Sequence, residues 1–320
     1  MEIFGDLGFD VLAVAGEGDA ERHVPGLGID DEVDDPRALE RALTRALFDV
    51  DLVVVENLAT IPLNIAASLA VGRVLAGRPA ILHHHDPPWH RAHFEHITEL
   101  PLRDAAWRHV TIHHIAAAEM AARGIHSTVI YNGFERSGHG RRRTTREALA
   151  VDEDEHLLVH PVRAIERKNV PTAISLAEAT GATYWLLGPP EDGYGDALAR
   201  LLREARCRVI HQPWVGEADI YSAADAVVYP STWEGFGNPP LEAALYRRHC
   251  VVGHYPFAGE LRSLGFSFID PDDSTTLREL IEAPDGHTLD LNEQLVKRHF
   301  SLEGVRRGIV ELLDGAGWLP

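Results

Sequence analysis

The sequence of 320 residues is poor in cysteine and in long apolar runs. Its two cysteines, Cys207 and Cys250, each lie at or beside a predicted apolar strand. This placement predicts buried, reduced thiols and argues against a disulfide framework or a cysteine metal site. No apolar run approaches the length of a membrane-spanning helix, and no secretory leader is recognisable at the N-terminus. We therefore expect no transmembrane segment and a cytoplasmic location.

Positive charge is also scarce. Lysine and arginine number 30 against 49 aspartates and glutamates, which gives a formal net charge of -19. This balance disfavours broad binding to nucleic acid or to anionic membranes, so neither is an expected partner. Any phosphate group must instead be held by a few local cations. The sequence leaves the oligomeric state open.

The length and the hydrophobic pattern predict a two-domain α/β protein. A hydrophobic fraction of 45% and a charged fraction of 25% are typical of a globular chain, and the length suffices for two cores. Apolar runs of strand length alternate with segments of helical period, which predicts parallel sheets covered by helices on both faces. No strand is followed by a three-glycine dinucleotide turn, so a nicotinamide-dependent dehydrogenase is disfavoured.

A polar stretch divides the two predicted domains. We predict a first domain over 1–136, a linker over 137–147, a second domain over 148–300, and a C-terminal helix over 301–320 that crosses back to the first domain. The arginines at 141–143 are expected to be solvated parts of the linker. The strand and glycine turn that normally open such a domain are not found at the N-terminus, so either the chain starts late or it lacks this element.

The most informative stretch runs from a predicted strand over 226–229 into a glycine-bearing loop and a helix. The loop contains Glu234 followed by Gly-Phe-Gly, and Asn238 with two prolines predicts an N-cap and a first helical turn. Glycines allow a close approach of the backbone to a ligand, and the unpaired N–H groups of a helix start suit phosphate and sugar oxygens. An ordinary surface helix with solvated carboxylates is the alternative interpretation.

Three histidines and an aspartate, His83 to Asp86, follow a predicted strand over 79–82 in the first domain. Neighbouring strand residues point to opposite faces, so the three imidazoles cannot converge on one ion, and we predict no metal site. Local hydrogen bonding by a loop histidine remains an alternative role.

Two cations lie between the first strand of the second domain and the helix that follows it. Arg163 follows the strand over 156–160, and Lys168 lies near the start of the next helix. Two cations five residues apart can converge on a diphosphate, with help from backbone N–H groups. A capped helix with ordinary surface charges is the alternative.

The arrangement of Glu234, seven residues, and Glu242, with Gly-Phe-Gly after the first glutamate, resembles the signature of the retaining glycosyltransferase family 4, the glycosyl transferases group 1. The resemblance covers nearly the whole chain and implies the GT-B fold, in which two Rossmann-like domains face each other across a cleft. It implies a retaining, metal-independent hexosyltransferase without a cofactor. The donor would be a nucleotide-diphosphate sugar and the acceptor a hydroxyl group.

The resemblance also implies roles for individual residues. Glu234 would hold the sugar hydroxyls and Glu242 the ribose, while Arg163 and Lys168 would stabilise the leaving diphosphate. His85, or His84 in its place, would reach the donor sugar from the first domain. Further donor contacts are expected from Trp214, Val215, Gly235, Phe236, Gly237 and Asn238, and acceptor contacts from Asn57, Asp86 and Trp89.

Two other functions remain open at this point. A sugar-nucleotide epimerase of the same fold would release nucleotide without an acceptor. An N-terminally truncated sugar-nucleotide-binding protein would bind the donor without turnover. The loop over 254–260 departs from the double-glycine pattern common in the family, which leaves the donor's identity open.

Overall fold

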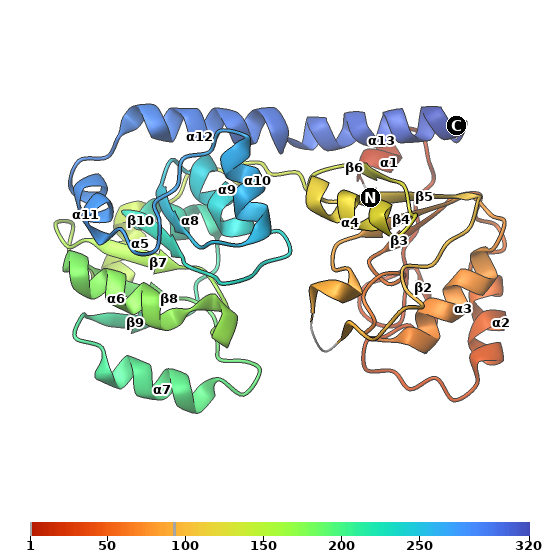
Figure 1. Ribbon diagram of the computed structural model, residues 1–320, viewed down its shortest axis with the longest axis horizontal. Helices are drawn as coiled ribbons and strands as arrows, with labels where there is room; N and C mark the ends of the chain where they lie inside the picture. Colours follow the sequence, from red (N-terminus) through yellow and green to blue (C-terminus); the bar gives the residue numbers. More distant parts are fainter. Residues whose placement is uncertain (1, 92–93) are drawn as a thin grey trace. The chain divides into compact units, whose positions relative to one another are not determined.

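The computed structural model describes residues 2–91 and 94–320 and divides the chain into two compact units. Unit 1 comprises Met1–Asn132 together with Glu303–Pro320, and unit 2 comprises Gly133–Leu302. Among the described residues, no helix is both long enough and apolar enough to cross a membrane. Each unit is an α/β structure built on a parallel sheet (Figure 1).

Unit 2 contains a five-stranded parallel sheet with the order β11-β10-β7-β8-β9. Its elements in chain order are α5 (Arg142–Ala148), β7 (Leu157–His160), η3 (Glu166–Lys168), α6 (Val170–Thr180), β8 (Thr183–Leu186), α7 (Gly195–Glu204), β9 (Val209–His211), α8 (Glu217–Ala223), β10 (Ala226–Tyr229), α9 (Asn238–Leu245), β11 (His249–Val252), α10 (Pro256–Ser263), α11 (Ser274–Glu282) and α12 (Gly286–His299). The order is that of a doubly wound sheet, whose direction of winding reverses between β7 and β10.

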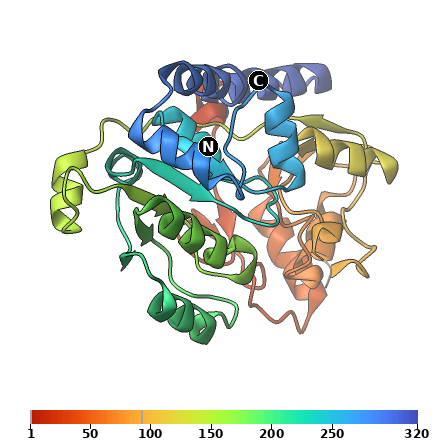
Figure 2. The same ribbon diagram turned by 60° about the vertical axis from the view of Figure 1, so that its left-hand side comes forward.

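Four of the five strands of the unit 2 sheet are buried throughout. Every residue of β7, β8, β10 and β11 is buried, as expected for a parallel sheet with helices on both faces. Helix α6 packs against β8 (Figure 2), whereas α8 packs against β7 and α9 against β10 and β11. The near-continuous apolar runs of the sequence are therefore core strands.

Unit 1 contains a four-stranded parallel sheet with the order β3-β4-β5-β6 and a separate two-stranded parallel sheet of β1 and β2. Its elements in chain order are α1 (Glu2–Asp6), β1 (Val14–Ala15), β2 (Arg22–His23), α2 (Pro36–Ala46), β3 (Val53–Glu56), α3 (Ile65–Leu75), β4 (Ala80–His84), η1 (Pro88–His90), β5 (Trp107–Thr111), α4 (His114–Ala122), β6 (Ser127–Val129) and α13 (Leu302–Ala316).

Local capping explains where the helices of unit 1 begin. The carboxylate of Asp35 accepts hydrogen bonds from the N–H groups of Arg37 and Ala38 at the start of α2, and Pro36 occupies the first turn. Asn64 caps α3 in the same way by accepting from the N–H of Ala67. Both helices then cover the sheet with leucine, valine and alanine side chains.

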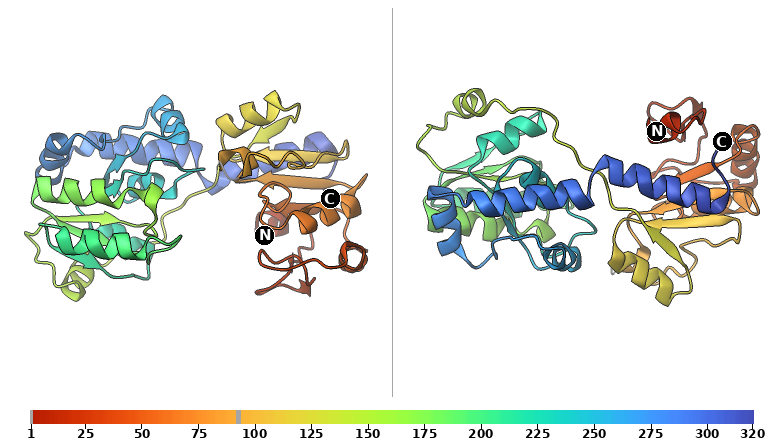
Figure 3. Two further views of the ribbon diagram at one scale, coloured as in Figure 1. Left: turned by 60° about the horizontal axis from the view of Figure 1, so that its bottom comes forward. Right: turned by 90° about the horizontal axis from the view of Figure 1, so that it is seen from above.

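The C-terminal helix α13 belongs to unit 1, where it covers the sheet (Figure 3). Its Leu313 is fully buried in an apolar cluster with Ile81 of β4 and Val110 of β5. Arg306 of α13 also pairs with Asp6 of α1 at 3.0 Å. The two chain ends of unit 1 are thus joined by both apolar and ionic contacts.

The predicted solvated linker is in part an ordered helix. Residues 142–148 form α5, which packs against α8, and Arg142 pairs with Asp225 at 2.6 Å. Arg141 pairs with Asp219, also at 2.6 Å, whereas Arg143 is 80% exposed. Since 70% of the Arg141 side chain is exposed, the expectation of solvated arginines is wrong only for Arg142, which is 39% exposed and bonds to Asp225 and to the carbonyl of Ser222. Composition misled for Arg142 because its partner Asp225 lies 83 residues further along the chain.

Candidate functional site

The strand ends of unit 2 bring the main predicted residues together. Strands β7 and β10 pair directly, and the winding of the sheet reverses between them. Open α/β sheets bind ligands at the carboxyl ends of the strands at such a reversal. Lys168 follows β7 on the short helix η3, and Glu234 follows β10.

Lys168 and Glu234 form a buried ion pair. The Nζ atom of Lys168 donates to the Oε1 atom of Glu234 at 2.5 Å and to the hydroxyl of Tyr229 at 3.0 Å. Only 7% of Glu234 and 8% of Lys168 is exposed. Since an unpaired buried charge is strongly unfavourable, each of the two charges depends on the other.

Arg167 is a further member of this group that the sequence analysis missed. Its NH1 atom donates to Oε2 of Glu234 at 2.6 Å and to the carbonyl of Trp233 at 3.0 Å. The two carboxylate oxygens of Glu234 are thus held by two different cations. The signal was present in the adjacent Arg-Lys pair, but the turn η3 that directs both side chains toward Glu234 is not evident from spacing alone.

The charges of the group shift the pKa values of its members. Burial raises the pKa of Glu234, but the charges of Lys168 and Arg167 outweigh burial and hold it below its usual range. Burial lowers the pKa of Lys168, despite the opposing effect of Glu234. The geometry favours an ionised carboxylate facing two cations, which is a centre able to orient hydroxyl groups and anions.

Arg163 lies apart from the ion pair. Its guanidinium pairs with Glu191 at 2.6 Å, and its side chain is 58% exposed. Its charge nevertheless lowers the pKa of Lys168. The two cations that the sequence analysis grouped therefore interact electrostatically, but only Lys168 contacts Glu234.

The glycine loop can present its backbone to a ligand. The ring of Phe236 is buried and stacks on Phe257 with centroids 4.2 Å apart, so its side chain belongs to the core. Gly237 has a φ of 84°, and a Cβ atom there would lie 2.8 Å from the hydroxyl oxygen of Tyr255. Only glycine suits this position. Gly235 precedes Phe236 and Gly237. Because the Phe236 side chain lies in the core and the two glycines have no side chain, the backbone is the part of this loop that can contact a ligand.

Asn238 does not cap helix α9, contrary to the prediction. The capping position is Gly237, and Asn238 is the first helical residue, with a proline next to it. The prediction placed the helix start one residue too late because the left-handed turn at Gly237 was not evident from the sequence.

Glu242 lies in the first turns of α9 in an environment that favours its neutral form. Burial raises its pKa to about 7, and the nearby charge of Glu217 acts in the same direction. A hydrogen bond from the hydroxyl of Tyr221 opposes this shift without cancelling it. A ligand whose hydroxyl groups donate hydrogen bonds to Glu242 would stabilise the ionised form of this carboxyl group.

The raised pKa of Glu242 predicts a pH-dependent stability. The folded protein holds a proton on Glu242 up to about pH 7, whereas the unfolded chain loses it near 4.5, so this residue destabilises the fold as pH rises through that window. Glu242→Gln should therefore gain unfolding free energy relative to wild type between pH 5 and pH 8, on the order of 1 kcal/mol or more. Urea unfolding at both pH values measures this difference. The exposed Glu204→Gln is the control, and an equal change in both variants would contradict the assignment.

The segment containing Trp214 and Val215 is anchored to the sheet of unit 2. The indole of Trp185 in β8 donates to the carbonyl of Gln212 at 2.9 Å, and the ring of Trp214 meets Trp185 edge to face. Val215 is 93% exposed. An exposed aliphatic residue on an anchored loop provides a surface on which a planar ring can lie.

In unit 1, Asn57 organises the turn after β4. Its side-chain oxygen accepts from the N–H groups of both His85 and Asp86 at 3.0 Å, and its amide donates to the Asp86 carboxylate at 3.0 Å. Its own backbone is left-handed, with a φ of 60°. The side chain of Asn57 thus holds the turn that carries His85 and Asp86, and its expected contact with an acceptor stays a prediction.

Trp89 is likewise engaged within unit 1. Its indole N–H donates to Glu119 of α4 at 2.8 Å, and Arg123 lies over its ring at 3.7 Å. These contacts fix the loop after β4 onto α4. An acceptor could meet the outer part of this loop, but the polar atom of Trp89 is already bonded.

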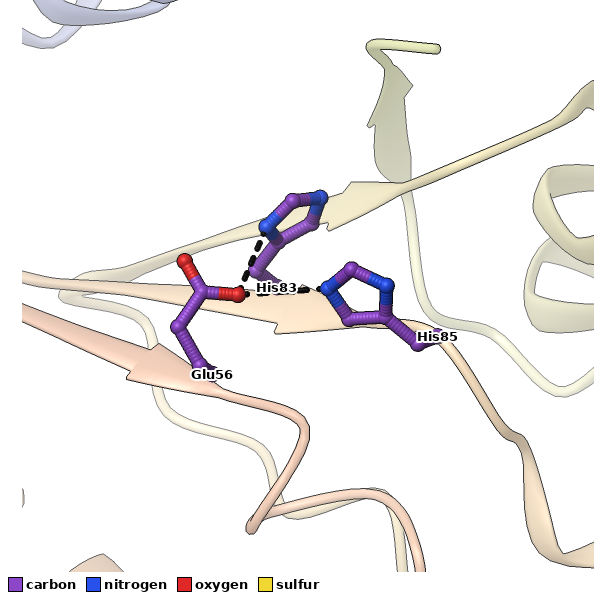
Figure 4. A group of neighbouring side chains, drawn as sticks. All are labelled: Glu56, His83 and His85. Carbon is purple, nitrogen blue, oxygen red and sulfur yellow. Dashed lines mark hydrogen bonds and ion pairs between the residues drawn. The ribbon is translucent and has the colours of Figure 1, made fainter. Parts of the chain in front are cut away.

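The three consecutive histidines occupy two different environments. His84 is fully buried, bonds to Thr60 through Nδ1, and bonds to His109 through Nε2 at 2.8 Å. His83 and His85 lie on the opposite side of the strand, where both contact Glu56 (Figure 4). His84 is thus a core residue and cannot take the place of His85 as a substrate contact.

Comparison with known families matches the part of unit 2 that carries this group. Residues 165–282 match the family described as Glycosyl transferases group 1. Two curated proteins named mannosylglucosylglycerate synthase are similar to the chain. The one from Thermotoga maritima is 26% identical over 82% of this chain and 75% of its own length, and the one from Petrotoga mobilis is 23% identical over 70% of this chain. The chain spans 64% of the Petrotoga protein.

The fold is also similar to that of solved glycosyltransferases. The structure of Anabaena HepE in complex with UDP-glucose superimposes with a TM-score of 0.69 at 20% identity and covers 87% of this chain and 82% of that protein. The two units, each built on a parallel sheet, have the architecture of the GT-B fold of these solved structures. The match to group 1 glycosyl transferases in unit 2 and the similarity to the two curated synthases support a glycosyltransferase of this fold.

Proposed function

We propose that the chain transfers a hexose from a nucleotide-diphosphate sugar to a hydroxyl acceptor, with retention at the anomeric carbon and without a metal ion in the transfer step. The observation that carries the proposal is the buried Lys168–Glu234 pair at the strand reversal of unit 2, beside the start of helix α9. This position combines cations, an ionised carboxylate and the positive dipole end of helix α9, which together suit a sugar attached to a diphosphate.

Each residue of the group has a proposed role at the donor. Glu234 holds hydroxyl groups of the sugar, and Lys168 with Arg163 neutralises the diphosphate as it leaves, a task that other enzymes give to a divalent ion. Arg167 keeps the carboxylate of Glu234 ionised and fixed in direction. Glu242 accepts from the ribose hydroxyls, and the backbone at Gly235, Phe236, Gly237 and Asn238 adds contacts. The nucleobase lies along Trp214 and Val215.

Unit 1 is the proposed source of acceptor contacts. Among the predicted residues, Asp86 and His85 still direct polar atoms away from the core, with side chains 30% exposed in each case. His85 is also the proposed sugar contact from this unit. The curated relatives are named for a product that contains glycerate, so a glucosylglycerate is a sensible member of an acceptor panel.

The proposal is tested by incubating the full chain with UDP-, GDP- and ADP-sugars, each with and without a panel of hydroxyl acceptors. We expect free nucleotide and a new glycoside to form together, only when an acceptor is present, with one nucleotide strongly preferred. Nucleotide release without an acceptor or glycoside would favour the epimerase. Donor binding with no turnover under any condition would favour the non-catalytic binding protein.

A further inference from the structure

Three potential metal ligands converge at the carboxyl ends of β3 and β4 in unit 1. Glu56 is the last residue of β3, and it is the register partner of His83 in β4. His85 lies two residues beyond His83, so both imidazoles project from the same side of the strand. Figure 4 shows the carboxylate of Glu56 facing both rings.

The distances within this cluster fit a single ion. The Oε2 atom of Glu56 lies 2.9 Å from Nδ1 of His83 and 3.2 Å from Nε2 of His85, and all three ligand atoms lie within 4.8 Å of one another. In a tetrahedral zinc site with bonds of about 2.0 to 2.1 Å, neighbouring ligand atoms are about 3.3 Å apart. A small outward movement of the three side chains would therefore admit an ion.

The surrounding structure fixes the backbone that carries the ligands. The N–H of Asn57 donates to the carbonyl of His83 at 2.8 Å, and its side-chain oxygen accepts from the N–H of His85 at 3.0 Å. His84 is held in the core by Thr60 and His109, which keeps its two neighbours on the opposite side. Such support of the ligand backbone is what a preorganised metal site requires.

The cluster also has suitable chemistry and access. Two imidazoles and a carboxylate suit zinc and other divalent transition metals, and three protein ligands leave one position open to water or to an oxygen of a bound molecule. The side chains of His83, His85 and Glu56 are 22%, 30% and 62% exposed, so an ion can enter from solvent. Burial raises the pKa of Glu56, but hydrogen bonds from the two histidines outweigh it and lower the pKa to about 2.

We propose that Glu56, His83 and His85 bind one divalent transition-metal ion, with zinc as the expected ion. The sequence analysis predicted no metal site because it considered only the three consecutive histidines and the aspartate after them. That argument holds for His84, but it overlooked a carboxylate on the neighbouring strand. The site is separate from the donor chemistry assigned to unit 2, although an ion bound here occupies the Nε2 atom of His85 and so competes with a sugar contact through that atom.

The proposal is tested on the untagged full chain after removal of metal with a chelator. Titration with zinc, and with cobalt as a visible-light probe of the same ligands, should reveal one ion per chain. His83→Ala, His85→Ala and the isosteric Glu56→Gln should each weaken binding by tenfold or more. His126→Ala removes an exposed histidine elsewhere in unit 1 and should bind like wild type.

A second measurement separates loss of the site from loss of the fold. Zinc should raise the thermal unfolding midpoint of wild type and of His126→Ala, but not that of Glu56→Gln. Without metal, Glu56→Gln should still unfold in a cooperative transition, which shows that the variant is folded. Equal zinc affinity in wild type and in the His83→Ala and His85→Ala variants would overturn the proposal. So would a loss of affinity in His126→Ala as large as that in His85→Ala.

Discussion

Glu234→Gln is expected to lower the turnover of nucleotide-sugar transfer by on the order of a hundredfold or more. The glutamine keeps the shape of the side chain but removes the charge that faces Lys168 at 2.5 Å and Arg167 at 2.6 Å. The glutamine amide has a single oxygen, so it accepts hydroxyl hydrogen bonds at one atom where the carboxylate has two. Turnover should be measured at saturating donor and acceptor, at a temperature where the unfolding curve shows the variant to be folded.

A double variant separates the catalytic role of Glu234 from its structural one. Glu234→Gln alone leaves Lys168 buried with a charge that has lost its main partner, which is destabilising. Adding Lys168→Met removes that charge, so the double variant should be more stable than the single one while its turnover stays low. Glu178→Gln, which breaks a surface pair with Arg206, is the matched control and should have normal turnover. Near-normal turnover in Glu234→Gln, or recovery of turnover with stability in the double variant, would remove this pair from the site.

Asp225→Ala is expected to have the largest effect on stability, a loss of about 3 kcal/mol of unfolding free energy. Arg146 of α5 is only 1% exposed, and Asp225 is the carboxylate that pairs with it, at 3.4 Å. Asp225 also pairs with Arg142 and accepts from the N–H of Leu157 at 2.8 Å. The substitution leaves a buried guanidinium without its counter-charge and an N–H at the start of β7 without its partner.

The stability prediction is checked by urea unfolding of the full chain. Asp154→Ala is the control, because this aspartate is exposed in the same unit, and it should change the unfolding free energy by less than about 0.5 kcal/mol. A loss below 1 kcal/mol in Asp225→Ala would show that α5 is held mainly by other contacts. It would also restore the interpretation of the stretch around residue 142 as a weakly attached linker.

The sequence predicted the core strands of unit 2 and the grouping of Lys168 with Glu234 for a clear physical reason. Parallel strands buried on both faces are apolar throughout, so segments such as Leu157–His160 and Ala226–Tyr229 are visible as short apolar runs. The residues that follow these two strands lie close together at one edge of the sheet once the strands pair. The contact of Lys168 with Glu234, 66 residues apart, follows from that pairing.

Features that depend on the direction of a side chain or on distant partners could not be predicted. The turn η3 directs Arg167 as well as Lys168 toward Glu234, and no periodicity in the sequence indicates this. Glu56 meets His83 only because of the register between β3 and β4. The hydrogen bonds of the Asn57 side chain to the turn after β4 likewise depend on the pairing of β3 with β4, which the sequence does not show.

The central claim is that a nucleotide-diphosphate sugar binds at the strand reversal of unit 2. Hydrogen–deuterium exchange on the full chain, with and without the donor that supports turnover, tests it most directly. We expect slower exchange over residues 163–169 and 234–242 when the donor is bound, and little change over the exposed helix α7. Protection confined to residues outside these two segments would contradict the account.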